Sequence, residues 1–509
     1  MPPLPVLMLP ETFAPLAAAF VPCFTEPTYR TFCYLVAGWV QCVGRHTVTG
    51  VAVAAGVVGV RSGRSWWHIS VFHRFFARAA WNADHLGLTV FRLARRWVPG
   101  DGPLIVLVDD TLARKHGKAI ALGSMHHDPL LSSVRKAFAS FGHVWVVLAL
   151  WVPLPFGVAG GPKGIALPLV FRLYVGSKCG NRADACAGAA GGTRATSGPR
   201  FQRAQTDFPP AEQRPTKPEL AREEIALVAQ WAAAFAPGRT VYVVGDTTYT
   251  NRTTMEGRPA NVEVVGRLRL DAALFAPPPP RQPGQRGRTR KKGARLPTPQ
   301  TMAVTRTTRG TWHRPRLHLY GKTVTPLVFR GTALWYGALR EAPVRFVVVR
   351  DPSGRRRDEA FFCTDLTTSV RFVLETYAKR WALEVTFFDC KQSLGFEEPQ
   401  NQVTRAVMRT APFAGIVYAL VVLWGAHEVA AGRAPRWIPR PWYRHKASLS
   451  FADLLAAFRQ ASACRLAPPI SAAPRPPRRP RNSRRCGSLI NATPASSPRA
   501  RRQKGGTRD

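Results

Sequence analysis

The stretch Tyr377-Ala-Lys-Arg-Trp-Ala-Leu-Glu-Val-Thr-Phe-Phe-Asp-Cys-Lys391 sets four polar residues at helical spacing among mostly apolar neighbours. If it is one helix, with about 100° of rotation per residue, those four fall within an arc of about 60°. They are Tyr377, Arg380, Glu384 and Lys391. The apolar neighbours indicate a helix packed against a core. A half-buried carboxylate among cations therefore predicts a site for a metal ion and a polyanion.

Two further acidic motifs directly follow runs of strand character. Residues 104–108 are an unbroken apolar run before Asp109 and Asp110, and residues 241–244 precede Asp246 by one glycine. Such runs are typical of buried strands, and open α/β sheets place their chemistry at strand ends. Taken singly, each Asp-Thr pair is more simply a turn or a helix N-cap. Two such aspartates followed by a helix with a third inward carboxylate favour one shared site.

These motifs resemble those of bacterial insertion-sequence transposases of the DDE class, whose glutamate helix carries a Y-R-E-K signature. Residues 377–391 match that signature at every spacing. Residues 104–118 are similar to the first-aspartate segment of the family, and residues 241–249 to the second. The three motifs follow in the family's order, and together they span about residues 104–405.

The resemblance implies an α/β fold, namely a ribonuclease-H-like mixed sheet flanked by helices. It also implies a mostly β insertion before the glutamate helix, and we expect a helical N-terminal domain. That domain is either DNA-binding or only an amphipathic bundle. The expected divisions are 1–100 for the helical domain, 101–275 and 366–460 for the catalytic core, 276–365 for the basic insertion and 461–509 for a basic disordered tail.

The resemblance assigns the catalytic acids, and the chemistry of their side chains agrees. Three converging carboxylates repel one another unless a divalent cation neutralises them, and oxygen-only ligands favour magnesium or manganese over zinc. We expect Asp109, Asp246 and Glu384 to hold two metal ions, which together would carry out two-metal phosphoryl transfer. Asp109 and Asp110 point to opposite faces of an extended strand, so only one meets the metal. Asp109 is favoured because it ends the apolar run, and Asp110 is the alternative.

The charge of the chain indicates a polyanionic partner. There are 72 Lys and Arg against 30 Asp and Glu, a formal net charge of +42. Such an excess favours nucleic acid or another anionic surface. Residues 281–295 hold seven of these cations and no acid, which indicates a flexible loop that binds DNA or is merely solvated. The expected DNA contacts are Tyr377, Arg380, Lys391, Arg288, Arg290, Lys291 and Lys292.

The remaining features argue against other classes of protein. The nine cysteines form no C-x-x-C pair, which favours a reducing cytoplasm over a zinc ribbon or a disulfide framework. Residues 144–161 are interrupted by prolines and residues 413–426 are short, so we interpret them as a buried strand and a core helix. We expect no membrane association, and a bacterial protein located in the cytoplasm at the nucleoid.

The hypothesis from sequence is a transposase with magnesium or manganese as cofactor. It would cut double-stranded DNA at inverted terminal repeats and join the ends to target DNA, acting as a homodimer on DNA. One alternative is a metal-dependent endonuclease without strand transfer. The other is an inactive DNA-binding descendant, which the intact set of three acids argues against.

Overall fold

The computed structural model describes residues 9–463 with gaps. The gaps are 59–60, 63–64, 67, 101, 118, 134, 157–162, 177–209, 211–212, 285, 306–311, 352, 355, 437–440, 443–445 and 447. Most of the stretch 176–217, which is rich in glycine and alanine, lies outside the described residues. So does the tail expected at 461–509, apart from its first three residues.

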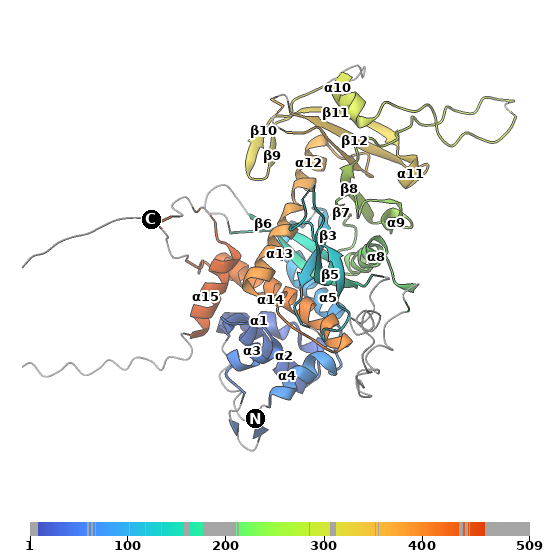
Figure 1. Ribbon diagram of the computed structural model, residues 1–509. Coiled ribbons are helices and arrows are strands. Elements are labelled where there is room, and N and C mark those ends of the chain that lie inside the picture. Colours follow the sequence, from blue (N-terminus) through green and yellow to red (C-terminus); the bar gives the residue numbers. More distant parts are fainter. Residues whose placement is uncertain are drawn as a thin grey trace, which may run out of the picture. The chain divides into compact units, whose positions relative to one another are not determined.

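A nine-stranded mixed sheet forms the centre of the fold (Figure 1). Its strands are β3 (Leu104–Arg114), β4 (Ser124–His127), β5 (Ala139–Leu154), β6 (Lys163–Tyr174), β7 (Val241–Gly245), β8 (Val262–Leu268), β11 (Leu327–Leu334), β12 (Pro343–Arg350) and β13 (Glu359–Cys363). The spatial order is β11-β12-β13-β8-β7-β3-β5-β4, and β6 also pairs with β5. Only the β3–β7 and β7–β8 pairs are parallel.

Helices lie on both faces of this sheet, which confirms the expected mixed sheet flanked by helices. The α-helices of the described residues are α1 (Ala14–Ala18), α2 (Glu26–Gln41), α3 (Val48–Ala54), α4 (Ile69–Ala77), α5 (Ala83–Ala94), α8 (Lys217–Phe235), α9 (Arg252–Met255), α10 (Pro299–Thr305), α11 (Tyr336–Leu339), α12 (Val370–Ala378), α13 (Trp381–Ser393), α14 (Thr404–Ala430) and α15 (Phe451–Ala463). Two small hairpin sheets stand apart, β1 (Arg61–Ser62) with β2 (Ser65–Trp66) and β9 (Leu317–Leu319) with β10 (Lys322–Val324).

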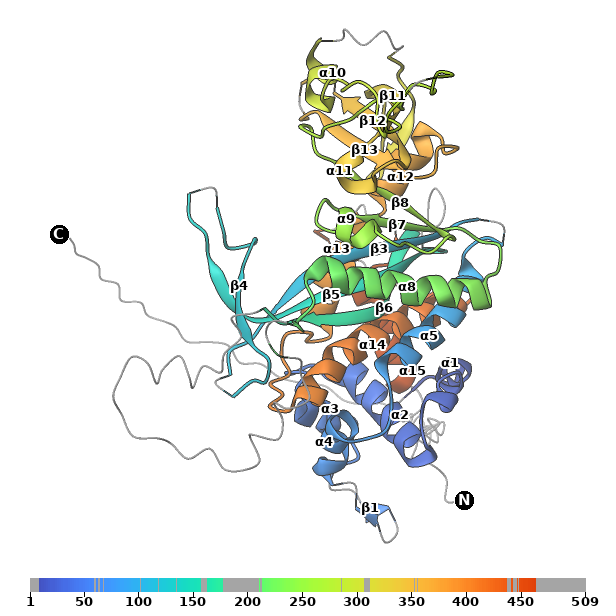
Figure 2. The same ribbon diagram turned by 90° about the vertical axis from the view of Figure 1, so that its right-hand side faces the viewer.

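Alternation along β6 shows which helices cover which face. Arg172 forms ion pairs with Asp84 of α5 and Glu223 of α8, at 2.8 and 2.9 Å. The next residue back, Phe171, lies against Gly415 of α14. Because successive side chains of a strand point to opposite faces, α5 and α8 share one face and α14 covers the other. Figure 2 shows α8 crossing β5 and β6.

Three strands of the insertion, β11, β12 and β13, continue the main sheet, whereas β9 and β10 form the separate hairpin. β13 pairs antiparallel with β8, and β12 and β11 follow it. A second, smaller hydrophobic core lies there, with Leu274, Val344 and Phe362 among its fully buried members. The insertion is thereby joined to β8, the strand that follows the second aspartate.

The N-terminal helices share the main core through α14. Phe413 of α14 lies at the centre of an aromatic cluster, with ring centroids 5.2 to 5.8 Å from those of Phe32, Trp39, Phe75 and Phe76. The aromatic residues of α4 are therefore core residues. Their burial in an amphipathic helical bundle explains these aromatic residues without a role in DNA binding.

Helix α14 is also long and apolar enough to cross a membrane by length and composition. In the fold, 83% of its most apolar window is buried inside the protein. It contacts β6, α5 and α4. Such burial is the property of a core helix.

Phe413→Ala should destabilise the protein by about 3–5 kcal/mol, because it removes the ring that the aromatic cluster surrounds. The measurement is equilibrium unfolding in urea. The control is Val43→Ala, at a side chain that is 88% exposed, which should change stability by less than about 0.5 kcal/mol. Equal stability of the two variants would show that α14 and the N-terminal helices do not share a core.

Candidate active site

The parallel pairing of β3 and β7 brings the first two acids to one edge of the sheet. The last register pair is Leu107 with Val244, and Asp109 and Asp246 each follow two residues later. Burial raises the pKa of Asp109 to about 7, and the nearby charge of Asp246 also raises it, while Arg380 lowers it. The two carboxylates therefore lie close enough to repel.

The Asp246 side chain is held by the turn that follows β7. Its Oδ1 accepts hydrogen bonds from the backbone N–H groups of Thr248 at 2.8 Å and Tyr249 at 3.3 Å. Thr250 donates its hydroxyl to the Asp246 carbonyl at 2.7 Å. The Asp246-Thr247 pair thus forms a turn, as the simpler interpretation of the sequence predicts. The interaction of Asp246 with Asp109 is a separate, tertiary feature.

The single helix expected over residues 377–391 is wrong, because the structure has two. Helix α12 ends at Ala378 and α13 begins at Trp381. Between them the backbone makes tight bonds, from Arg380 N–H to the Tyr377 carbonyl and from Leu383 N–H to the Arg380 carbonyl, both 3.0 Å. These bonds span three residues instead of four, as in a 3₁₀ turn. Glu384 consequently lies in the first turn of its own helix.

Arg380 connects the acid of the sheet to the acid of the helix. Its Nη1 bonds Asp109 Oδ2 at 2.5 Å, and its Nη2 bonds Glu384 Oε1 at 2.6 Å. One guanidinium therefore lies between two of the three expected ligands. We had expected this residue to contact DNA phosphates, and in the free protein it contacts the acids.

The other two residues of the signature, Lys391 and Tyr377, differ in their surroundings. Lys391 donates to the Leu112 carbonyl at 2.6 Å and pairs with Glu397 at 3.3 Å. Tyr377 is buried, with its ring centroid 4.8 Å from that of Phe361. Burial raises the pKa of Tyr377, and the charges of Arg380 and Asp246 also act on it, so Tyr377 stays near the acids and Lys391 alone is directed elsewhere. The DNA contacts of Tyr377 and Lys391 stay predictions.

Asp110 points to the opposite face of β3 from Asp109. Its carboxylate pairs with Lys217 of α8 at 2.8 Å and accepts a hydrogen bond from the Tyr249 hydroxyl at 2.6 Å. Asp109 instead contacts Arg380 on the face that α13 covers. The structure therefore separates the two aspartates that the sequence left as alternatives.

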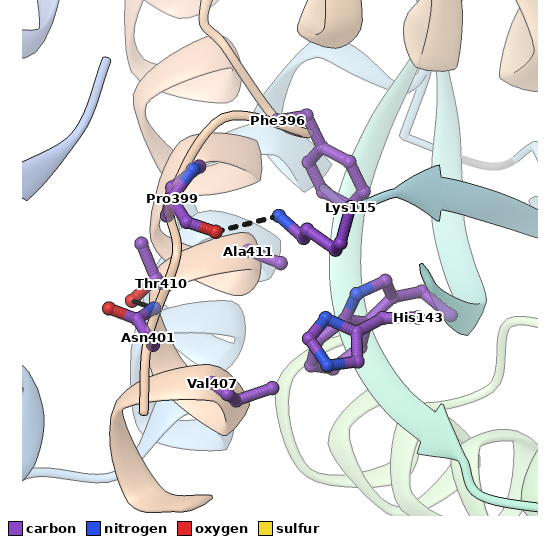
Figure 3. Close-up of a pocket in the computed structure, with 9 residues that line it drawn as sticks. Lys115, His143, Phe396, Pro399, Asn401, Val407, Thr410 and Ala411 are labelled. Carbon is purple, nitrogen blue, oxygen red and sulfur yellow. Dashed lines mark hydrogen bonds between the residues drawn. The ribbon is translucent and has the colours of Figure 1, made fainter. Parts of the chain in front are cut away.

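The segment after α13 is held against the end of β3. Lys115 directs its ammonium to the carbonyl of Glu397 at 2.8 Å and to that of Pro399 at 3.0 Å. Figure 3 shows the bond to Pro399. Burial lowers the pKa of Lys115 to about 8. A small cavity beside it is lined by His143, Asn401 and six others besides Lys115. Lys115 and Lys391 together thus fix α13 to the strand that carries Asp109.

The four cations expected to bind DNA in the insertion do not behave alike. Lys291 pairs with Glu341 at 2.5 Å, and the Lys292 ammonium lies 4.1 Å from the centroid of the Phe275 ring. Arg288 and Arg290 are exposed. The DNA contacts of all four stay predictions.

Sequence reasoning missed Tyr320, at the tip of the β9–β10 hairpin. Burial raises its pKa, and the charges of Arg380 and Glu384 also act on it, which places it near the site. Tyr320 and Gly321 have φ angles of 52° and 75°, as a two-residue hairpin turn requires. In the sequence, the Tyr320-Gly321 pair between two short runs of strand character is the feature that could have predicted this hairpin.

The donor chemistry of the site fits a divalent cation. The three acids supply only carboxylate oxygens, which hard cations prefer. A positive group already lies between Asp109 and Glu384, since the Arg380 guanidinium bonds both. Among the described residues, no three His, Cys, Asp or Glu side chains are grouped tightly enough to hold one ion. Arg380 occupies Oδ2 of Asp109 and Oε1 of Glu384, so in the free protein it competes with a cation for these two oxygens.

The chain belongs to the DDE superfamily endonuclease family, whose sequence model matches residues 19–323, more than half of the chain. The matched part contains Asp109, Asp110 and Asp246 and ends before Glu384. Among solved structures, the chain is similar to a piggyBac transposase synaptic complex with hairpin DNA. The identity is 12%, covering 91% of this chain and 79% of that one, with a TM-score of 0.34. No curated protein matches the chain.

Lys391→Met should lower the free energy of unfolding by about 1–3 kcal/mol, because it leaves a carbonyl and a carboxylate without their charged partner. Affinity for DNA should change little if Lys391 keeps its inward position. Urea unfolding and fluorescence-anisotropy titration with duplex DNA measure the two effects. Unchanged stability together with clearly weaker DNA binding would contradict a role for Lys391 in holding α13 against β3.

Proposed function

We propose that the protein is a DDE transposase that cleaves transposon DNA ends and joins them to target DNA in a metal-dependent reaction. One observation carries the proposal. Two carboxylates that follow neighbouring parallel strands act on each other electrostatically, and a cationic side chain links one of them to the carboxylate of α13. Family membership supports a DNA-cleaving activity.

The strand order supports a ribonuclease-H-like core. Within the sheet, β6, β5, β3, β7 and β8 lie in that spatial order. The first three are antiparallel, and β7 and β8 run parallel to β3. This arrangement has three early strands, a helix, a strand before the second acid and a late helix with the third, as the proposed fold requires.

In the proposed reaction, Asp109, Asp246 and Glu384 hold magnesium or manganese. Bound ions of this kind activate the attacking oxygen and stabilise the leaving oxygen of a phosphodiester. The protein's own contribution is to position the acids. The turn after β7 fixes Asp246, and Lys115 and Lys391 hold α13 against β3.

Arg380 has two possible partners in this reaction, the carboxylates and the DNA backbone. An arginine forms strong charge-assisted bonds with both carboxylate and phosphate groups. We propose that Arg380 moves from Asp109 and Glu384 to a phosphate when DNA binds. The two acids then become free to act as metal ligands.

Double-stranded DNA is the proposed partner. The formal net charge of +42 supports it, because clustered cations gain affinity from release of counterions. Inverted terminal repeats as the substrate, a homodimer on DNA and a cytoplasmic, nucleoid-associated location belong to the same proposal. An endonuclease without strand transfer would share the site, so the joining assay decides between them.

Asp246→Asn and Glu384→Gln should each abolish nicking, because each removes a proposed metal ligand, and both should leave DNA affinity close to wild type. The assay uses labelled DNA carrying the ends that flank the gene, a target plasmid and magnesium or manganese. Nicked and joined products are scored separately.

The wild-type protein should be inactive in EDTA and recover on addition of manganese. The matched control is Glu256→Gln, at an exposed carboxylate in a surface ion pair with Arg252. Full activity in EDTA would refute the metal-dependent mechanism. Nicking that never yields joined product would move the assignment to the plain endonuclease.

Arg380→Gln should tighten binding of Mn²⁺ to the free protein by about tenfold or more. The wild-type acids must give up charge-assisted bonds worth about 1.5–3 kcal/mol, and about 1.4 kcal/mol corresponds to a factor of ten. Isothermal titration with Mn²⁺ measures this without any cleavage. Arg252→Gln, in an exposed ion pair, is the control. Equal affinities of wild type and Arg380→Gln would contradict the exchange of partners.

A further inference from the structure

We propose that Asp110 is a positioning residue, which fixes the second catalytic aspartate through Tyr249. The inference rests on the proposed function of Asp109, Asp246 and Glu384. It assigns Asp110 to neither metal ligation nor contact with DNA. Its role is to set where Asp246 lies relative to Asp109.

Tyr249 makes one bond to each acid-bearing segment. Its backbone N–H donates to Asp246 Oδ1 at 3.3 Å, and its hydroxyl donates to Asp110 Oδ1 at 2.6 Å. Asp110 follows Asp109 directly along β3. A single side chain thus spans from the turn that holds Asp246 to the strand that holds Asp109.

Packing gives this link little freedom. Tyr249 is fully buried. Gly245, the last residue of β7, lies so close that an added Cβ would be 3.0 Å from both the Tyr249 Cβ and the Val108 Cγ1. The absence of a side chain at this position lets the tyrosine pack against the junction of β3 and β7.

The other oxygen of Asp110 is also occupied. Its Oδ2 pairs with Lys217, at the start of α8, at 2.8 Å. The carboxylate is therefore held from two sides on the face opposite to Asp109. Groups that orient metal ligands through hydrogen bonds commonly change metal affinity by about 10–100-fold when they are removed. Tyr249 and Asp110 have this relation to Asp246.

The test compares five variants of the full chain in Mn²⁺ binding, which is followed by the electron paramagnetic resonance signal of free Mn²⁺. Tyr249→Phe removes only the hydroxyl, and Asp110→Ala removes its acceptor. Each should weaken Mn²⁺ binding by about tenfold. The double variant should be no weaker than either single one, because both changes break the same link.

Two conservative variants separate positioning from other roles. Asp110→Asn keeps an oxygen that can accept from Tyr249, so it should bind Mn²⁺ nearly as well as wild type. Lys217→Met removes the other partner of Asp110 and keeps the tyrosine link, so it is the matched control and should also stay close to wild type. The metal concentration for half-maximal nicking should follow the same order.

Three outcomes would overturn the inference. Loss of Mn²⁺ binding in Asp110→Asn, to the extent expected of Asp109→Asn, would make Asp110 a ligand. Wild-type Mn²⁺ affinity in Tyr249→Phe would show that the link positions nothing. If the wild-type protein itself binds no Mn²⁺ and nicks no DNA, the proposed function fails and the inference fails with it. Failure of the variants alone leaves the proposed function standing.

Discussion

The bond between Arg380 and two carboxylates is the interaction on which the site depends. It connects Asp109 on the sheet, 271 residues before Arg380 in the sequence, to Glu384 on α13. Without a cation between them, the two acids would repel each other in a partly buried place, where charges are weakly screened. The protein therefore contains its own counter-charge, and the same residue can bind phosphate.

Two adjacent aspartates of β3 have different roles because their side chains point to opposite faces of the sheet. Asp109 faces α13 and the proposed metal site, and Asp110 faces α8 and the tyrosine that holds the Asp246 turn. Helix α8 supplies Lys217 on that second face. One face of the sheet thus carries the proposed metal site, and the contacts on the other face fix the positions of the acids.

Local patterns predicted a large part of this fold. The apolar runs at 104–108 and 241–244 placed β3 and β7 and the aspartates after them. The break between α12 and α13 could not be predicted, since neither proline nor glycine marks it. The partners of Arg380 and Lys391 depend on tertiary neighbours, because an arginine or lysine pattern fits an inward carboxylate as well as a phosphate. The pairing of β13 with β8 is equally non-local.

The central claim is that Asp109, Asp246 and Glu384 hold one metal centre. Iron-directed cleavage of the chain tests it most directly: Fe²⁺ replaces magnesium, and ascorbate with peroxide then cuts the backbone near the bound iron. With DNA present, we expect cuts mapped by mass spectrometry beside all three acids, lost in Asp246→Asn and on addition of excess magnesium. Cuts near only one of the acids, or cuts elsewhere that magnesium does not suppress, would contradict the claim.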